Sequence, residues 1–286
     1  SDYQATLTRS YGRDFKRNYS LSINWRKEEY SLSQNANKYR VLVPPDLIET
    51  RLNLNMLFGF YYYSTVKYLD NFGNTEDLTL GLWVEFSTGR SFDILDGNIL
   101  RNYGNATIKT SFRISNNLFV SAEAGISGRY INEDYEHMRY SQRMSLYLKN
   151  SHRMISAFRI LGRFYDRPDR FTVNYIGGKN GLRGYENFDL AGQNYVIANF
   201  EQRYYSPIEI LTVAFGTAAF IDAGKTWYEG AGYDSEGWKS NAGIGFRFGL
   251  TKSSGFKVVR MDIAKSLTEN SYYISFGTEM YFKFAD

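Results

Sequence analysis

The sequence contains no cysteine, only 4 prolines and only 2 histidines in 286 residues, so disulfides and thiolate metal sites are excluded. It also lacks any run approaching the roughly 20 consecutive apolar residues that a membrane-spanning helix needs. Its 34 basic and 30 acidic residues leave a net charge of +4 that is spread along the chain. That distribution does not suggest a nucleic-acid partner.

Aromatic residues, in contrast, are abundant, with 25 Tyr and 21 Phe, while the mean hydropathy is only −0.44. Only helices and closed barrels satisfy the backbone inside lipid, and the strands of a barrel are half polar. If the chain enters a membrane without apolar runs, it does so as a β-barrel.

Alternation of apolar and polar residues recurs about a dozen times along the chain. Residues 271–284 are the clearest case, because one face collects Tyr272, Ile274, Phe276, Thr278, Met280, Phe282 and Phe284. Segments 105–115 and 240–251 alternate in the same way, with lysine or arginine on the polar face. Successive side chains of a strand point to opposite faces, so the pattern predicts an apolar face toward lipid and a polar lumen.

This periodicity predicts an all-β fold, a transmembrane antiparallel up-and-down β-barrel. About thirteen strands are expected, near 3–12, 17–32, 49–69, 76–88, 105–115, 117–130, 139–149, 152–164, 191–205, 210–224, 238–250, 256–264 and 271–284. Longer loops are expected at 33–48, 89–104, 131–138, 165–190 and 225–237, opposite short turns on the periplasmic side. Because single-chain barrels normally have an even number of strands, we expect residues 1–286 to form a C-terminal barrel that lacks its first strands.

The longest loop carries a glycine-rich motif. Its residues are Gly177, Gly178, Gly181, Leu182, Arg183, Gly184 and Tyr185. The motif resembles the signature of the BamA/TamA superfamily of outer-membrane assembly and translocation barrels, a glycine pair followed by (V/L)RG(F/Y) in the sixth external loop. Phe220-Ile221-Asp222-Ala223-Gly224 resembles the F-x-D-x-G strand motif of the same superfamily. The resemblance is strongest from about residue 150 to the end.

The resemblance implies a sixteen-strand barrel with periplasmic POTRA domains upstream, and a loop that folds back into the lumen. It also implies that Arg183 engages acidic residues of the inner wall. Strand alternation independently turns Glu201 and Asp222 inward if Phe200 and Ile221 face lipid. Family members usually end in an aromatic residue that serves as an assembly signal, and Phe282 and Phe284 preserve that pattern ahead of Ala285 and Asp286.

Other candidates for chemistry are weak. His137 and His152 fall in predicted loop or turn positions without a metal-ligand constellation, so a solvated role is favoured. Glu133, Asp134 and Glu136 form an acidic group for which a solvated loop is favoured over cation binding. Because no nucleophile triad or phosphate-binding loop occurs, we expect no catalytic residue, metal or cofactor.

The resemblance implies an integral protein of the Gram-negative outer membrane that inserts or translocates outer-membrane or surface proteins. Its expected partners are the lipid bilayer with its lipopolysaccharide, unfolded client proteins and periplasmic or lipoprotein accessory subunits. Two alternatives stay open. One is a passive pore or membrane anchor for a fused periplasmic or surface enzyme, and the other is a secretion pore for a single partner.

Overall fold

The computed structural model describes residues 1–30, 46–73, 75–98, 100–131, 134–231, 237–252 and 258–284. Almost all of the regular structure in these residues is β-strand, and the one short helix is a 3-10 turn at Glu229–Ala231. No helix in the described ranges has the length and hydropathy to cross a membrane.

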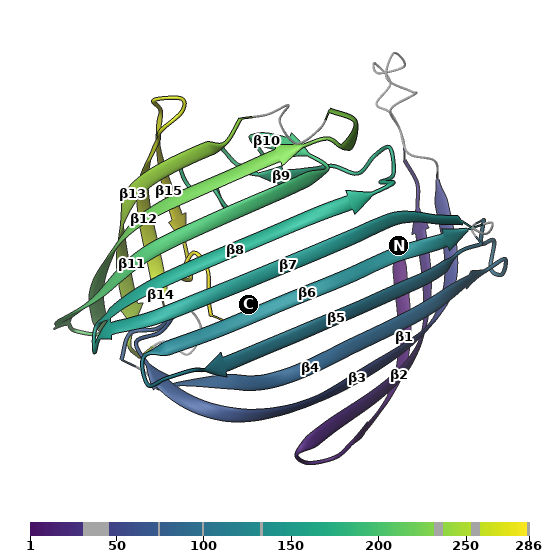
Figure 1. Ribbon diagram of the computed structural model, residues 1–286, viewed down its shortest axis with the longest axis horizontal. Helices are drawn as coiled ribbons and strands as arrows, with labels where there is room; N and C mark the ends of the chain where they lie inside the picture. The colour runs from purple at the N-terminus through teal and green to yellow at the C-terminus, as the bar shows by residue number, and fades with distance from the viewer. Residues whose placement is uncertain are drawn as a thin grey trace.

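Thirteen strands form one antiparallel sheet in which sequence neighbours are also spatial neighbours (Figure 1). They are β1 (Asp2–Tyr11), β2 (Phe15–Glu28), β3 (Leu47–Lys67), β4 (Thr75–Phe92), β5 (Asn102–Arg113), β6 (Leu118–Ile131), β7 (Asp134–Ser151), β8 (Met154–Asp166), β11 (Asn194–Ile210), β12 (Val213–Trp227), β13 (Lys239–Leu250), β14 (Val258–Ser266) and β15 (Tyr272–Gly277). A separate hairpin, β9 (Asn174–Ile176) with β10 (Leu190–Gly192), lies in the loop between β8 and β11. The predicted all-β fold and the strand number are confirmed.

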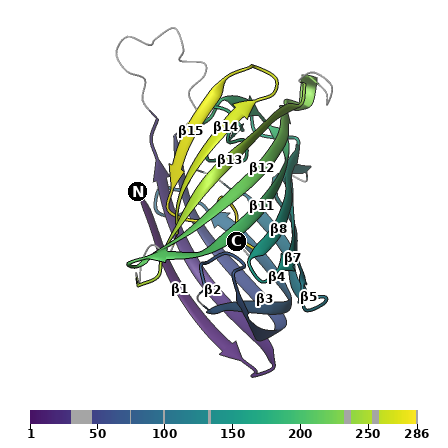
Figure 2. The same ribbon diagram turned by 90° about the vertical axis from the view of Figure 1, so that its left-hand side faces the viewer.

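The sheet is strongly curled and its strands are tilted, which is the shape of a barrel wall (Figure 1). Its two edges are β1 and β15, and both can be followed in Figure 2. Among the described residues these two strands are not hydrogen-bonded to each other, so the sheet is open.

The two faces of the wall have the predicted characters. On β13, Ile244 and Phe246 are exposed on the outer face, whereas Asn241 and Arg247 are buried on the inner face. On β5, Ile108 and Phe112 are likewise exposed. A soluble barrel would place these sets the other way round, so the wall has an apolar exterior and, at these positions, a polar interior.

One predicted loop differs from the structure. The prediction of a long loop at 131–138 is wrong, because β6 continues to Ile131 and β7 begins at Asp134. Tyr130 pairs with Tyr135 across this hairpin, which continues the ladder past a bulge. His137 therefore lies within β7 rather than in a loop. Of the acidic group, Glu133 is outside the described residues, and Asp134 pairs with Arg167 at 2.6 Å.

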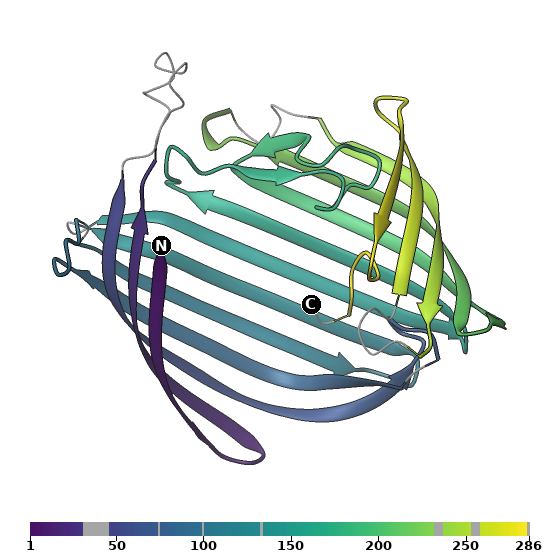
Figure 3. The ribbon, with the colours of Figure 1, turned by 180° about the vertical axis from the view of Figure 1, so that it is seen from behind.

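The C-terminal strand is also shorter than predicted. It ends at Gly277 instead of residue 284, and residues 278–284 turn into the lumen (Figure 3). Phe282 and Phe284 are buried against the inner-wall residues Phe119 and Tyr147, so the prediction that they lie on the lipid face is wrong.

The lumen offers this segment both apolar contacts and backbone partners. The carbonyl of Phe282 accepts a hydrogen bond from Arg203 at 2.7 Å, and the amide of Phe284 donates one to Asp70 at 2.9 Å. These two hydrogen bonds replace part of the backbone pairing that the segment would have in the sheet. The same residues form a cluster that fills the inside of the barrel at its short-turn end.

Candidate functional site

The loop between β8 and β11 returns into the barrel and packs on its inner wall (Figure 3). Leu182, Arg183 and Tyr185 are all fully buried. Leu182 and Tyr185 belong to an apolar cluster with Ile176 and Ile197, which anchors the loop to β9 and β11.

Glycines allow the loop to lie this close to the wall. Gly181 has a φ of +107°, and a Cβ there would lie 2.5 Å from Ile197. At Gly184 a Cβ would lie 2.4 Å from the Cβ of Asn241. Gly177 and Gly178 also have positive φ, at +127° and +48°. Glycine adopts such conformations without the steric cost that other residues incur, so the glycine pair makes the sharp turn and Gly181 and Gly184 make the close approach.

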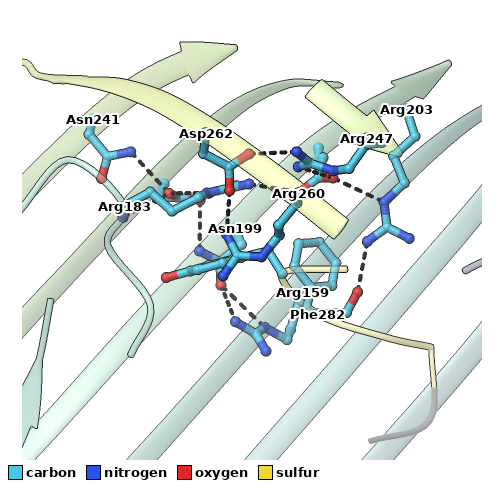
Figure 4. Close-up of polar contacts among 12 residues, drawn as sticks. Arg159, Arg183, Asn199, Arg203, Asn241, Arg247, Arg260, Asp262 and Phe282 are labelled. Atoms are coloured by element: carbon cyan, nitrogen blue, oxygen red, sulfur yellow. Dashed lines mark hydrogen bonds and ion pairs between the residues drawn. The ribbon is translucent and has the colours of Figure 1, made fainter. Parts of the chain in front are cut away.

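Arg183 is held by two carboxylates of the wall (Figure 4). Its Nε and Nη2 donate to the two oxygens of Asp222, at 2.9 and 2.8 Å, and its Nη1 donates to Glu201 at 2.8 Å. Paired, parallel N–H···O bonds from a guanidinium to one carboxylate are among the stronger hydrogen bonds in proteins. The side chain of Arg183 therefore ties the loop to both β11 and β12.

Two aromatic rings pack against the guanidinium of Arg183. The Arg183 carbon Cζ lies 3.5 Å from the centre of the Phe220 ring and 4.2 Å from that of Tyr281. Burial alone would lower the pKa of Arg183, but the charges of Asp222 and Glu201 and the hydrogen bonds to Asp222 together outweigh it and hold the pKa above its ordinary value. Arg183 thus stays charged in a dry environment where its two ion pairs are weakly screened.

A row of polar side chains across three neighbouring strands forms the floor under Arg183. Asn199, Asp222 and Asn241 are direct cross-strand partners on β11, β12 and β13. Both asparagine amides donate to Asp222, at 2.8 and 2.9 Å. Asn199 also donates to the carbonyl of Gly181 at 2.7 Å, so the same row binds the loop backbone.

The ion pairs continue along the inner wall beyond Arg183. Glu201 also accepts from Arg203 at 3.2 Å and from Arg247 at 3.0 Å. Arg247 donates to Asp262 at 2.6 Å, and Asp262 accepts from Arg260 as well. Arg203 reaches Asp70 in the β3–β4 turn at 2.7 Å.

The network contains as many arginines as carboxylates, so its charges balance. Its four arginines are Arg183, Arg203, Arg247 and Arg260, and its four carboxylates are Asp70, Glu201, Asp222 and Asp262. A carboxylate removed from water is costly unless it is paired, and every carboxylate of this network has at least one arginine partner. Such a network positions a loop and does not leave an acid or base poised for proton transfer.

Two further motif residues, Tyr185 of the loop and Gly224 of the wall, complete the contact between loop and wall. Tyr185 donates to the carbonyl of Ser240 at 3.1 Å and accepts from Ser266 at 3.0 Å. A Cβ at Gly224 would lie 3.3 Å from Leu182, so the glycine leaves room for that side chain. The structure thus brings together the loop motif, Glu201, Asp222, Phe220 and Gly224.

Sequence reasoning missed the wider network. Alternation placed Arg247 on the polar face of 240–251 but did not connect it to Glu201. Arg203, Arg260 and Asp262 also lie on inward positions, so strand alternation was a signal that could have found them. Tyr281 occupies a position on the other face of the alternation in residues 271–284, but nothing in its sequence context connects it to Arg183. His152 stacks edge-on with Tyr68, with ring centres 5.1 Å apart. The described part of the chain contains no group of histidines and carboxylates that could hold a metal ion.

Two solved structures of outer-membrane proteins are similar to this chain in fold. The crystal structure of BamA from Haemophilus ducreyi lacking POTRA domains 1–3 matches 96% of this chain and 60% of its own length, with a TM-score of 0.56 and 13% identity. CdiB from Escherichia coli matches 96% of this chain and 51% of its own length, with a TM-score of 0.51 and 13% identity. No protein-family model and no curated protein sequence matches.

The chain has the fold of a BamA-type barrel. It spans between half and three-fifths of the length of these two structures. At 13% identity the likeness concerns the fold, and the roles of individual residues rest on the contacts described above.

Proposed function

We propose that this chain is the barrel of an outer-membrane protein that inserts or translocates other proteins. The observation that carries the proposal is the burial of Arg183 between Asp222 and Glu201, at the tip of a loop that has returned into the lumen. The BamA-type fold and the apolar outer face support it. The outer membrane is the location that fits such a face, with lipid and lipopolysaccharide around the wall.

The clients that suit this architecture are unfolded outer-membrane or surface proteins. β15 is an edge strand of the described sheet, and an edge presents unpaired backbone groups on which another chain can add a strand. A client strand added to such an edge would expose its apolar side chains on the lipid side of the sheet. Accessory periplasmic or lipoprotein subunits would deliver the client.

Depletion of the protein from its native cells tests the proposal. A broad fall in outer-membrane proteins is expected, and re-expression of the wild-type chain should reverse it. An unchanged profile would contradict the proposal and favour a membrane anchor for a fused enzyme. Loss of a single exported protein, with all others unchanged, would instead favour a dedicated secretion pore.

Site-specific photo-crosslinking tests the proposed edge. A crosslinker at Ile274, exposed on the terminal strand β15, should capture nascent outer-membrane proteins. The matched control is Ile108, which is also exposed but lies on β5 in the middle of the sheet. Equal capture at both positions would show that the edge has no special role.

A further inference from the structure

Arginines line the inner wall on the half of the sheet opposite the Arg183 site. Arg51 on β3, Arg129 on β6 and Arg139 on β7 all turn inward. Their sequence neighbours Leu52, Tyr130 and Tyr140 are exposed on the outer face, as the alternation requires. Arg26 on β2 joins them, so one side of the lumen carries a cationic surface.

These arginines surround a cavity of about 490 Å³. Its other polar lining comes from His137, Tyr103 and short side chains of the intervening strands, including Asn53, Ser87, Asn105 and Ser127. Small residues in front of long cationic ones leave a hollow of the size that binds small molecules. No carboxylate lines the cavity within the described ranges.

Several guanidinium groups at the cavity have unused hydrogen-bond donors. The buried Nε atoms of Arg51, Arg129 and Arg139 find no acceptor among the described residues. A buried donor without an acceptor is destabilising, and an arginine donor more so because of its charge. In the Arg183 network, by contrast, every arginine contacts a carboxylate. An anionic group is therefore the kind of partner that the cavity arginines lack.

Three nearby carboxylates already have partners, and two of these partners are arginines of the cavity. Glu49 accepts from the hydroxyl of Tyr103, and Asp169 pairs with Arg129 beside His137. Glu28 pairs with Arg26. Arg51 lies over the ring of Tyr103, with its Cζ 4.5 Å from the ring centre, which holds the guanidinium in place. Arg51 and Arg139 form no ion pair with any described residue, so the cavity keeps a positive charge.

We propose that this cavity is a binding site for a small soluble oxyanion that carries two or more phosphate or carboxylate groups. The planar guanidinium matches such groups with two parallel hydrogen bonds, and the asparagine and serine side chains add neutral donors. The ligand enters from the lumen, because the lining side chains face inward. This site is separate from the Arg183 network and does not depend on the proposed transport function.

Calorimetric titration of the refolded barrel in non-ionic detergent tests the proposal, with tripolyphosphate as the phosphate probe and citrate as the carboxylate probe. Saturable binding of at least one probe is expected, weakening as salt is added. Arg139→Gln should weaken binding at least tenfold, while Arg13→Gln, an exposed arginine in the β1–β2 turn, should leave it unchanged.

Arg51→Gln provides a second variant, and the heat-modifiable gel shift verifies that each variant is folded. Absence of saturable binding for both probes would overturn the proposal. Binding that is equally strong in folded Arg139→Gln, Arg51→Gln and wild-type protein would overturn it as well. A preference for tripolyphosphate over citrate would assign the site to phosphorylated ligands, and the reverse preference to carboxylates.

Discussion

The Cζ atom of Arg183 lies 4.2 Å from the centre of the Tyr281 ring, and the hydroxyl of Tyr281 bonds the loop that carries Arg183. That hydroxyl accepts from the amide of Gly181 at 2.8 Å and donates to the carbonyl of Gly178 at 2.7 Å. The lumenal loop and the C-terminal segment therefore hold each other inside the barrel.

Two substitutions of Tyr281 distinguish the contribution of its hydroxyl from that of its ring. Tyr281→Phe leaves Gly178 and Gly181 without their shared partner, and we expect the free energy of unfolding to fall by about 1–3 kcal/mol. Tyr281→Ala also removes the ring over Arg183 and should cost more. Urea unfolding in detergent measures both. Tyr272→Phe, at an exposed tyrosine of β15, is the control and should match wild type.

Removal of Arg183 tests its ion pairs. Arg183→Ala leaves Asp222 and Glu201 buried with fewer partners, so we expect a loss of about 3–5 kcal/mol and a lower temperature for the heat-modifiable gel shift. Arg13→Ala, at an exposed position, should have no effect. Wild-type thermal behaviour of Arg183→Ala would eliminate a structural role for this residue.

Gly243 leaves the room that the Phe220 ring occupies. A Cβ at Gly243 would lie 2.4 Å from the Phe220 ring and 2.3 Å from the carbonyl oxygen of Ile263. Gly243→Ala should therefore displace the ring on which Arg183 rests and destabilise the barrel. Gly104→Ala is the matched control, because nothing lies within 4 Å of a Cβ there. Thermal melts of the two variants should differ, and equal melting temperatures would contradict this role of Phe220.

The C-terminal segment shields the inner wall at the short-turn end of the barrel. Ala157, buried on the inner face of β8, belongs to the cluster that contains Phe282 and Phe284. Because the chain has no cysteine of its own, Ala157→Cys introduces a single thiol. We expect that thiol to resist a water-soluble maleimide in the otherwise unchanged chain and to react once Phe282→Ala and Phe284→Ala are added.

Leu211→Cys is the reagent control for that experiment. Leu211 lies in the exposed β11–β12 turn, so its cysteine should react in both backgrounds. Rapid labelling of Ala157→Cys in the presence of both phenylalanines would contradict the buried position of the segment.

Strand alternation predicted most of the wall and the centre of the site. Because alternation fixes the face on which each side chain lies, it placed Glu201 and Asp222 inside, where Arg183 meets them. It failed after Gly277, because residues 278–284 alternate equally well whether they are paired in the sheet or folded into the lumen. The pattern reports which side chains share a face, but not whether the backbone stays hydrogen-bonded to its neighbour.

Asp70 shows a second limit of the sequence. It lies in the turn between β3 and β4, 133 residues before Arg203, and contacts it only because the turn folds inward. Leu69 and Phe72 of that turn are buried beside Tyr205, which explains the inward fold. Alternation describes strands, so it carries no information about where a turn packs.

A double-mutant cycle between Arg183 and Asp222 tests the central claim most directly, that the loop is fixed in the lumen by this pair. Arg183→Met, Asp222→Asn and the double variant would be unfolded in urea under identical conditions. The contacts predict that the second substitution costs much less once the first is present, with a coupling free energy of about 2 kcal/mol or more. Strictly additive losses would show that the two side chains do not interact and would contradict the account.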